Sequence, residues 1–100
     1  MTTGPGIRLD VRAVPRLKSH VRLQFNEARG QWIVQAPERV LMPDEIAISV
    51  LKRCDGTANI AVIAASLARE YDAPPETVEN DVLEMLQELA EKGIIDDARA

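Results

Sequence analysis

The sequence predicts an α+β domain in which an amino-terminal three-stranded antiparallel sheet precedes a three-helix bundle. Two observations lead to this prediction. Before residue 43, apolar residues alternate with polar ones in separate short stretches, which is the period of half-buried strands. After residue 43, apolar residues recur every three or four positions in three successive segments, which is the period of amphipathic helices. The chain of 100 residues is long enough for one such domain.

Two stretches of alternating residues predict a β-hairpin. In residues 20–25 and 32–36 every second side chain is apolar, and these side chains are Val21, Leu23 and Phe25, then Trp32, Val34 and Ala36. Asn26 and Gly30, which lie between the two stretches, favour a turn of more than two residues. We therefore expect two antiparallel strands joined by this turn.

A third and very short strand is predicted at residues 40–42. Val40, Leu41 and Met42 are apolar, but the next residue, Pro43, has no N–H to donate to a ladder. So short a segment fits the edge of a sheet, where unpaired backbone groups allow another chain to add itself. Side-chain alternation places Leu41 on the face opposite to Val40 and Met42, so some of the three must belong to the core.

Three helices are predicted after this strand, the first from about Asp44 to Cys54. Asp44 and Asn59 are suitable N-cap residues for the first two helices, and Pro75 suits the first turn of the third. Gly56 and Gly93 are expected to supply left-handed caps after the first and third helices. The short turn between the second and third helices has helix-turn-helix spacing, which makes the predicted architecture winged-helix-like.

The two ends of the chain are predicted to lie outside the domain, which we place at residues 16–95. Residues 1–15 contain two glycines and two prolines without a sustained period, which is typical of a flexible lead or linker. Ile94 and Ile95 are expected either to form a last short strand or to pack under the helices. Residues 96–100 are predicted to be a frayed tail.

The distribution of charge argues against DNA as a partner. Residues 1–42 carry seven Lys/Arg against three Asp/Glu, whereas residues 43–100 carry five against thirteen. The third helix would enter the major groove in a helix-turn-helix protein, yet it has no Lys or Arg between residues 76 and 91. Because DNA binding depends on neutralising phosphates, we do not expect a nucleic-acid partner.

The sequence offers few residues for catalysis. His20 is the only histidine and Cys54 the only cysteine, so neither a His/Cys metal set nor a Cys–His pair with a third group can form. Cys54 falls in phase with the apolar side of the first helix, which predicts a buried structural thiol. No apolar run approaches the length of a membrane span, and no signal peptide is evident. We expect a cytoplasmic protein without enzyme activity, metal, cofactor or membrane contact.

Residues 15–95 resemble the PqqD family of pyrroloquinoline quinone (PQQ) biosynthesis. The resemblance rests on a set of short motifs, namely Pro15-Arg16-Leu17, Gln31-Trp32, the APERV run at residues 36–40, Cys54-Asp55-Gly56, Tyr71-Asp72 and the Leu-rich last helix. The family often has Leu-Asn-Glu after the third strand, where this chain has Met42-Pro43-Asp44-Glu45. Pro43 lacks a backbone donor, which weakens pairing at the end of that strand.

The resemblance implies a peptide chaperone rather than a catalyst. Proteins of this family bind the ribosomal precursor peptide PqqA and present it to the radical-SAM enzyme PqqE, and the same fold serves other modified-peptide pathways as a leader-recognition element. The resemblance further implies that the peptide adds as a strand to the sheet edge and packs against the last helix. The expected peptide-binding residues are Arg39, Val40, Leu41 and Met42 on the edge, and Val82, Met85, Leu86 and Leu89 on the helix. Arg39 is also expected to meet a peptide carboxylate.

Three alternatives stay open. Each of the four helix residues is apolar at core spacing, so each has a purely structural alternative. The domain could be an acidic winged-helix scaffold that recruits a protein partner without a peptide substrate. The exposed edge could also pair with its own copy, so the sequence is compatible with a monomer and with a homodimer.

Overall fold

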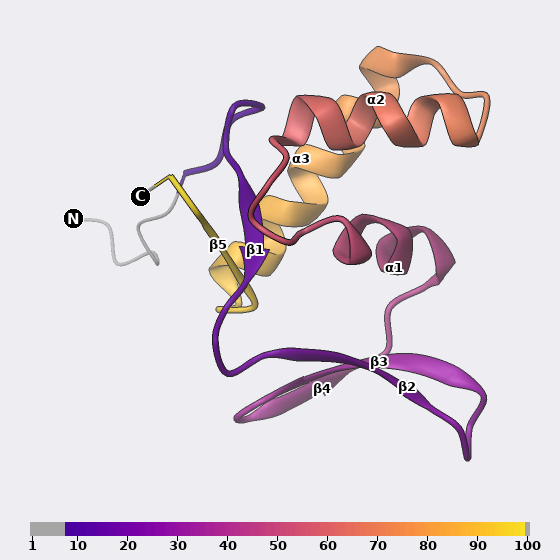
Figure 1. Cartoon of the computed structure of the whole chain (residues 1–100), viewed down its shortest axis with the longest axis vertical. Helices are drawn as coiled ribbons and strands as arrows, with labels where there is room; N and C mark the ends of the chain where they lie inside the picture. The colour runs from indigo at the N-terminus through magenta and orange to yellow at the C-terminus, as the bar shows by residue number, and fades with distance from the viewer. Residues whose placement is uncertain (1–7, 100) are drawn as a thin grey trace.

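The computed structural model describes residues 8–99 and contains two sheets and three helices (Figure 1). The elements are β1 (Pro15–Leu17), β2 (Arg22–Asn26), β3 (Gln31–Ala36), β4 (Arg39–Leu41), α1 (Glu45–Lys52), α2 (Ile60–Glu70), α3 (Pro75–Glu91) and β5 (Ile95–Asp97). Strands β2, β3 and β4 form an antiparallel sheet in that order, and β1 pairs antiparallel with β5 in a second sheet. The predicted α+β class, with three strands before three helices, is confirmed. Of the two expectations for Ile94 and Ile95, the last short strand is present as β5, and both side chains are also buried in the core, whereas β1 was not predicted.

The three-stranded sheet has one face turned towards the helices and one turned away. Leu23, Val34 and Leu41 are direct cross-strand neighbours. Val34 is 1% exposed, and the other two are half-buried against the core. Residues at the intervening positions therefore point to the opposite face, and Val40 is 53% exposed there. The predicted hairpin is confirmed, as is the prediction that Leu41 and Val40 lie on opposite faces.

An aromatic contact at the start of β3 holds this sheet to α1. The ring of Phe25 meets the ring of Trp32 edge-on, with centroids 5.5 Å apart. The Lys52 ammonium, at the end of α1, lies 4.4 Å from the centroid of the Trp32 ring, which is within the range of a cation–π contact. In Figure 1, α1 accordingly lies directly above the sheet, with α2 and α3 beyond it.

The predicted helix starts are confirmed. The Asp44 carboxylate accepts a hydrogen bond from the Ala47 N–H at 2.8 Å, and the Asn59 side chain accepts one from the Val62 N–H at 2.8 Å. Pro75 is the first residue of α3. These contacts satisfy N–H groups that have no partner inside a helix.

The two glycines predicted to cap helices behave differently. Gly93 follows the C-cap residue of α3 with φ at 79°, as expected. The prediction for Gly56 is wrong, because α1 ends at Lys52 with Arg53 as its C-cap. Gly56 does adopt a left-handed φ of 82°, but its N–H donates to the Pro15 carbonyl at 3.0 Å. Its conformation serves to bring the chain alongside β1.

The core lies between the helices and is closed by β5. The largest completely buried side chains are those of Pro15, Val34, Val50, Ile60, Ile63, Leu86, Ile94 and Ile95. The prediction of a buried thiol at Cys54 is confirmed, since its Sγ is buried and donates to the Val50 carbonyl at 3.3 Å. Burial, with a smaller contribution from Asp55, raises the pKa of Cys54 to about 12. The thiol is therefore protonated at neutral pH.

Residues 1–15 were predicted to be a flexible lead. This prediction is wrong for residues 8–15, and residues 1–7 lie outside the described residues. Leu9 and Ala13 belong to the core, at 5% and 0% exposed. The segment also supplies backbone acceptors to the start of α2, because the Ile60 N–H donates to the Ala13 carbonyl at 3.0 Å. A neighbouring bond joins the Ala61 N–H to the Val11 carbonyl at 2.9 Å. The segment is ordered because it pairs with otherwise unpartnered helix donors.

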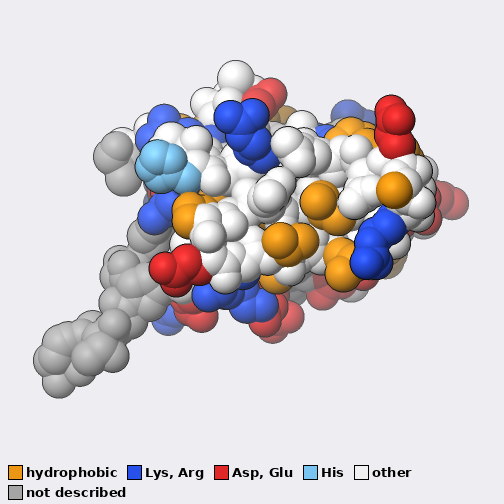
Figure 2. Space-filling model, turned by 90° about the horizontal axis from the view of Figure 1, so that it is seen from below, with side chains coloured by type: hydrophobic (Ala, Val, Ile, Leu, Met, Phe, Trp, Pro, Cys, Tyr) orange, Lys and Arg blue, Asp and Glu red, His pale blue; other side chains and the backbone are white. Residues whose placement is uncertain are grey.

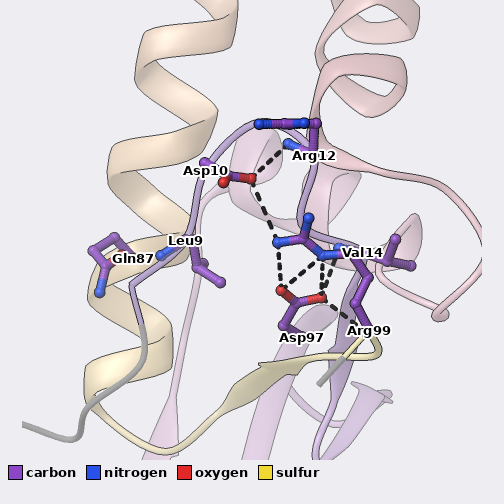
Figure 3. Close-up of polar contacts among 7 residues, drawn as sticks. All are labelled: Leu9, Asp10, Arg12, Val14, Gln87, Asp97 and Arg99. Carbon is purple, nitrogen blue, oxygen red and sulfur yellow. Dashed lines mark hydrogen bonds and ion pairs between the residues drawn. The ribbon is translucent and has the colours of Figure 1, made fainter.

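The predicted frayed tail is also ordered as far as residue 99; Ala100 lies outside the described residues. Ile95–Asp97 form β5, opposite β1. Asp97 accepts the Val14 N–H at 3.0 Å and forms an ion pair with Arg99 at 2.8 Å. Arg99 also reaches Asp10 at 3.4 Å, and Figure 3 shows how these side chains fasten the two ends of the domain to each other. Among the helices of residues 8–99, none has the length and apolar content needed to cross a membrane.

Candidate functional site

The free edge of β4 is the first component of the candidate site. Within residues 8–99, β4 pairs with β3 on one side and has no strand on the other. Val40 and Met42 are 53% and 58% exposed. Arg39 is exposed as well, and it forms no ion pair with any described residue. An unpaired edge of this kind offers backbone N–H and C=O groups to an added strand.

The second component is an apolar pocket of about 220 Å³ between the three helices. Its lining residues are Ile46, Leu67, Tyr71, Ala73, Thr77, Val78, Asp81, Val82 and Met85. Ile46 and Tyr71 are 53% and 41% exposed, so two large apolar side chains stand at the surface. Ile46 lies in the first turn of α1, four residues after Met42, so the pocket begins close to where the chain leaves β4. A more open hollow along α3 is lined mainly by carboxylates and suits apolar side chains less well.

Polar contacts between α1 and α2 fix the wall of the pocket. The hydroxyl groups of Ser49 and Tyr71 lie 3.1 Å apart, within hydrogen-bond distance. Arg53 donates to the Ser49 carbonyl at 2.8 Å and forms an ion pair with Glu70 at 2.7 Å. These contacts join α1 and α2 and thereby hold the side of the pocket that contains Ile46 and Tyr71.

The eight residues predicted to bind peptide occupy three different environments. Arg39, Val40 and Met42 are exposed on the edge, whereas Leu41 is half-buried against the core. Met85 is half-buried and Val82 is 4% exposed, and both line the apolar pocket. Leu89 packs against the core outside the pocket lining, and Leu86 is completely buried. Leu86 therefore has the purely structural role that was the alternative for each of the four helix residues. A peptide could touch its side chain only if the core were repacked.

The sequence analysis missed the residues that α1 and α2 contribute to the pocket. Ile46 precedes the buried Val50 by one helical turn, so it lies beside the buried side of α1, yet its side chain is 53% exposed. A large apolar side chain at the border of the buried side of a helix can extend an interaction surface, and its place in the first turn of α1 could have identified Ile46. Tyr71 reaches the pocket only through the packing of α2 on α3, which the sequence pattern does not show.

Residues 8–99 contain no cluster of three or more His, Cys, Asp or Glu side chains suited to holding a metal ion. The Cys54 thiol is buried and lies outside the pocket lining. The described residues offer main-chain hydrogen-bonding groups on β4, an apolar pocket and the charge of Arg39.

Comparison with known sequences identifies relatives over most of the chain. The family model "Coenzyme PQQ synthesis protein D (PqqD)" matches residues 31–95. A "PqqA binding protein" of Rhodopseudomonas palustris is 47% identical over 85 residues, covering 85% of this chain and 83% of the relative. A "PqqA binding protein" of Xanthomonas oryzae pv. oryzae is 47% identical over 81 residues, covering 81% of this chain and 88% of the relative.

Two solved structures share the fold. The first is the solution structure of the PqqD truncation of Methylobacterium extorquens PqqCD, described as a functional, stand-alone recognition element for ribosomally synthesised and post-translationally modified peptides. It has a TM-score of 0.77 at 40% identity and covers 89% of this chain and 95% of its own. The crystal structure of PqqD from Xanthomonas campestris has a TM-score of 0.53 at 44% identity and covers 85% of this chain and 94% of its own. The family match, the sequence identities and the shared fold together show that this chain belongs to the PqqD family.

Proposed function

We propose that this protein is a non-catalytic peptide chaperone of PQQ biosynthesis. It binds a PqqA-type precursor peptide by strand addition to β4 and presents the peptide to the radical-SAM enzyme PqqE in the cytoplasm. The observation that carries the proposal is an open strand edge that leads directly into an apolar pocket. The names of the relatives, which are PqqA binding proteins, and the description of the M. extorquens domain as a recognition element support it.

The two components of the site have different tasks in this mechanism. Main-chain hydrogen bonds to β4 give affinity for an extended peptide with little regard to its sequence. An apolar peptide side chain that enters the pocket against Ile46 and Met85 fixes the register of the added strand. Arg39 attracts a peptide carboxylate at the other end of β4. Binding of this kind holds the peptide extended, which is the form a modifying enzyme can reach.

A proline substitution tests strand addition directly. Residues 37 and 38 form the turn between β3 and β4, so Ala36 and Arg39 close a two-residue hairpin. Pairs alternate along an antiparallel ladder, and we therefore expect Val40 to direct its N–H and C=O towards the free edge. Val40→Pro removes that donor while an edge strand tolerates the ring. We expect PqqA binding to weaken by about tenfold or more, because a main-chain bond is lost and the ring obstructs the incoming strand.

Val40→Ala is the matched control, because it shortens the same side chain but keeps the N–H. We expect its affinity for PqqA to stay within about threefold of wild type, since the side chain points away from the helices. Fluorescence anisotropy of a labelled PqqA peptide would measure both affinities, and circular dichroism would show that both variants are folded. Equal losses in the two variants would point to side-chain contact and contradict strand addition.

Amide-resolved NMR would locate the site. During titration of the labelled protein with unlabelled PqqA peptide, we expect the largest shifts at residues 38–42 and around Ile46, Val78 and Met85. An unchanged spectrum at near-millimolar peptide, in a folded and monomeric sample, would refute the chaperone function. It would favour the scaffold alternative.

A further inference from the structure

One face of the three-stranded sheet is covered by no element of the described chain. We call it the outer face and define it by Arg22, Gln24, Ile33, Gln35 and Val40. Arg22, Gln35 and Val40 form one cross-strand row, and Gln24 lies opposite Ile33 in the next. Ile33 is half-buried and the other four are exposed. Figure 2 shows the molecule from the side of this sheet, with apolar side chains across the surface and most Asp and Glu side chains towards the rim.

The charge on the outer face itself is positive. Arg22 carries the only charge among its five residues, and it forms no ion pair within residues 8–99. Residues 22–41, which span the three strands of the sheet, contain three Lys/Arg against two Asp/Glu, whereas residues 43–100 contain five against thirteen. Arg22 together with the apolar side chains of Ile33 and Val40 favours a partner that brings a carboxylate next to an apolar side chain.

The outer face is continuous with the peptide site. A strand added to β4 extends this sheet by one strand, and its side chains alternate between the two faces. One set turns towards the helices and the apolar pocket. The other set lies on the outer face beside Val40, where no element of the described chain covers it. A protein that acts on the bound peptide therefore meets the peptide's accessible side chains and the outer face together.

We propose that the outer face is the docking surface for the enzyme that modifies the bound peptide. The proposal rests on the proposed function and specifies where that partner binds. The enzyme contacts Arg22 through a carboxylate and Ile33 through an apolar side chain, and the added peptide strand completes the surface. Binding through a face that the peptide itself widens makes the enzyme select the peptide-loaded form.

The test separates enzyme docking from peptide binding. Arg22→Glu and Ile33→Thr change the outer face at positions that lie outside the predicted peptide-binding set. Two affinities are measured for each variant, that of PqqA for the protein and that of purified PqqE for the protein–PqqA complex. Arg69→Glu is the matched control, since Arg69 is exposed on α2 without an ion pair within residues 8–99 and the charge change is the same.

We expect Arg22→Glu to weaken PqqE binding by about tenfold or more and Ile33→Thr by about threefold or more, while PqqA affinity stays within about twofold. Arg22→Lys should restore PqqE binding, and added salt should weaken it in the wild type. Wild-type PqqE affinity in both outer-face variants would overturn the inference and leave the proposed function standing. A parallel loss of PqqA affinity would assign the face to the peptide site. A wild-type dimer that Arg22→Glu converts to a monomer would make it a self-interface, and either result would also overturn the inference.

Discussion

Strands β1 and β4 are both three residues long, yet only one of them is left open. β1 pairs with β5 on one side and contacts residues 54–56 on the other. There the Leu17 N–H donates to the Cys54 carbonyl at 3.3 Å, and the Gly56 N–H donates to the Pro15 carbonyl at 3.0 Å. β4 pairs with β3 alone within residues 8–99. The comparison shows that shortness by itself does not leave a strand edge free. This domain closes the strand that joins its two ends and leaves open the strand beside its apolar pocket.

The open edge carries features that limit unwanted pairing. Pro37 precedes β4 and Pro43 follows it, and Arg39 places a charge at its start. Prolines and charges are devices that keep exposed edges from pairing with other sheets. They also restrict strand addition to very few main-chain bonds. A specific peptide must therefore gain additional free energy from the pocket, which explains why the edge and the pocket occur together.

The largest expected loss of folding stability is for a substitution in β5, which pairs with β1, compared with one in the open edge strand β4. Ile95 in β5 is completely buried, whereas Val40 in β4 is 53% exposed. Ile95→Ala should lower the free energy of unfolding by about 2–5 kcal/mol, because it leaves a cavity in the core. Val40→Ala should change it by only about 0.5 kcal/mol or less. Urea denaturation would measure both, and similar losses would show that β4 is more strongly integrated into the fold than its exposure indicates.

The second largest expected loss of stability concerns the Asp97 carboxylate, which links the segment before β1 to the end of the chain. Asp97 accepts the Val14 N–H, forms an ion pair with Arg99, and its side chain is only 12% exposed. Asp97→Asn should lower the free energy of unfolding by about 1–2 kcal/mol at neutral pH, because charge-assisted hydrogen bonds are replaced by weaker ones. PqqA affinity should be unchanged, since β4 is not involved. A stability equal to that of wild type would show that β1–β5 pairing does not depend on this carboxylate.

The same residue gives a pH dependence with a definite sign. The hydrogen bond from Arg99 is the main cause that lowers the pKa of Asp97 from 3.8 to about 2, and the Val14 N–H acts in the same direction. The stabilisation is therefore fully present above the unfolded-state pKa and is lost as the pH falls through about 2. Denaturation of wild type and Asp97→Asn at a series of pH values should show curves that converge in acid. A constant difference down to pH 2 would contradict this assignment.

The smallest expected loss of stability comes from removing a helix N-cap, and it tests whether the cap of α1 positions the pocket residue Ile46. Asp44 caps α1 immediately after β4, and Asn59 caps α2 far from the edge. Either substitution by Ala should lower the free energy of unfolding by about 1 kcal/mol. Only Asp44→Ala should also weaken PqqA binding, by about twofold to fivefold, because fraying of the first turn displaces Ile46 from the pocket wall. Equal peptide affinities in the two variants would show that the cap does not position Ile46.

The sequence by itself determined the local elements of this protein. Alternation predicted the β2–β3 hairpin and the opposite faces of Leu41 and Val40, and side-chain chemistry predicted the caps Asp44 and Asn59. These features depend on residues within a few positions of one another, so they can be read along the chain. The resemblance added β4 and α3 as the parts of the peptide site, and the edge position of β4 agrees with it.

Only the tertiary structure decided which of these residues are accessible and how the ends are held. The bond that joins Val14 to Asp97 spans 83 positions, so no local pattern near residue 14 predicts β1 or its pairing with a strand at residues 95–97. Leu86 and Met85 are neighbours on α3, yet Leu86 is completely buried in the core whereas Met85 is half-buried and lines the pocket. Periodicity identifies an apolar stripe, but the packing partners determine which part of that stripe remains free to bind.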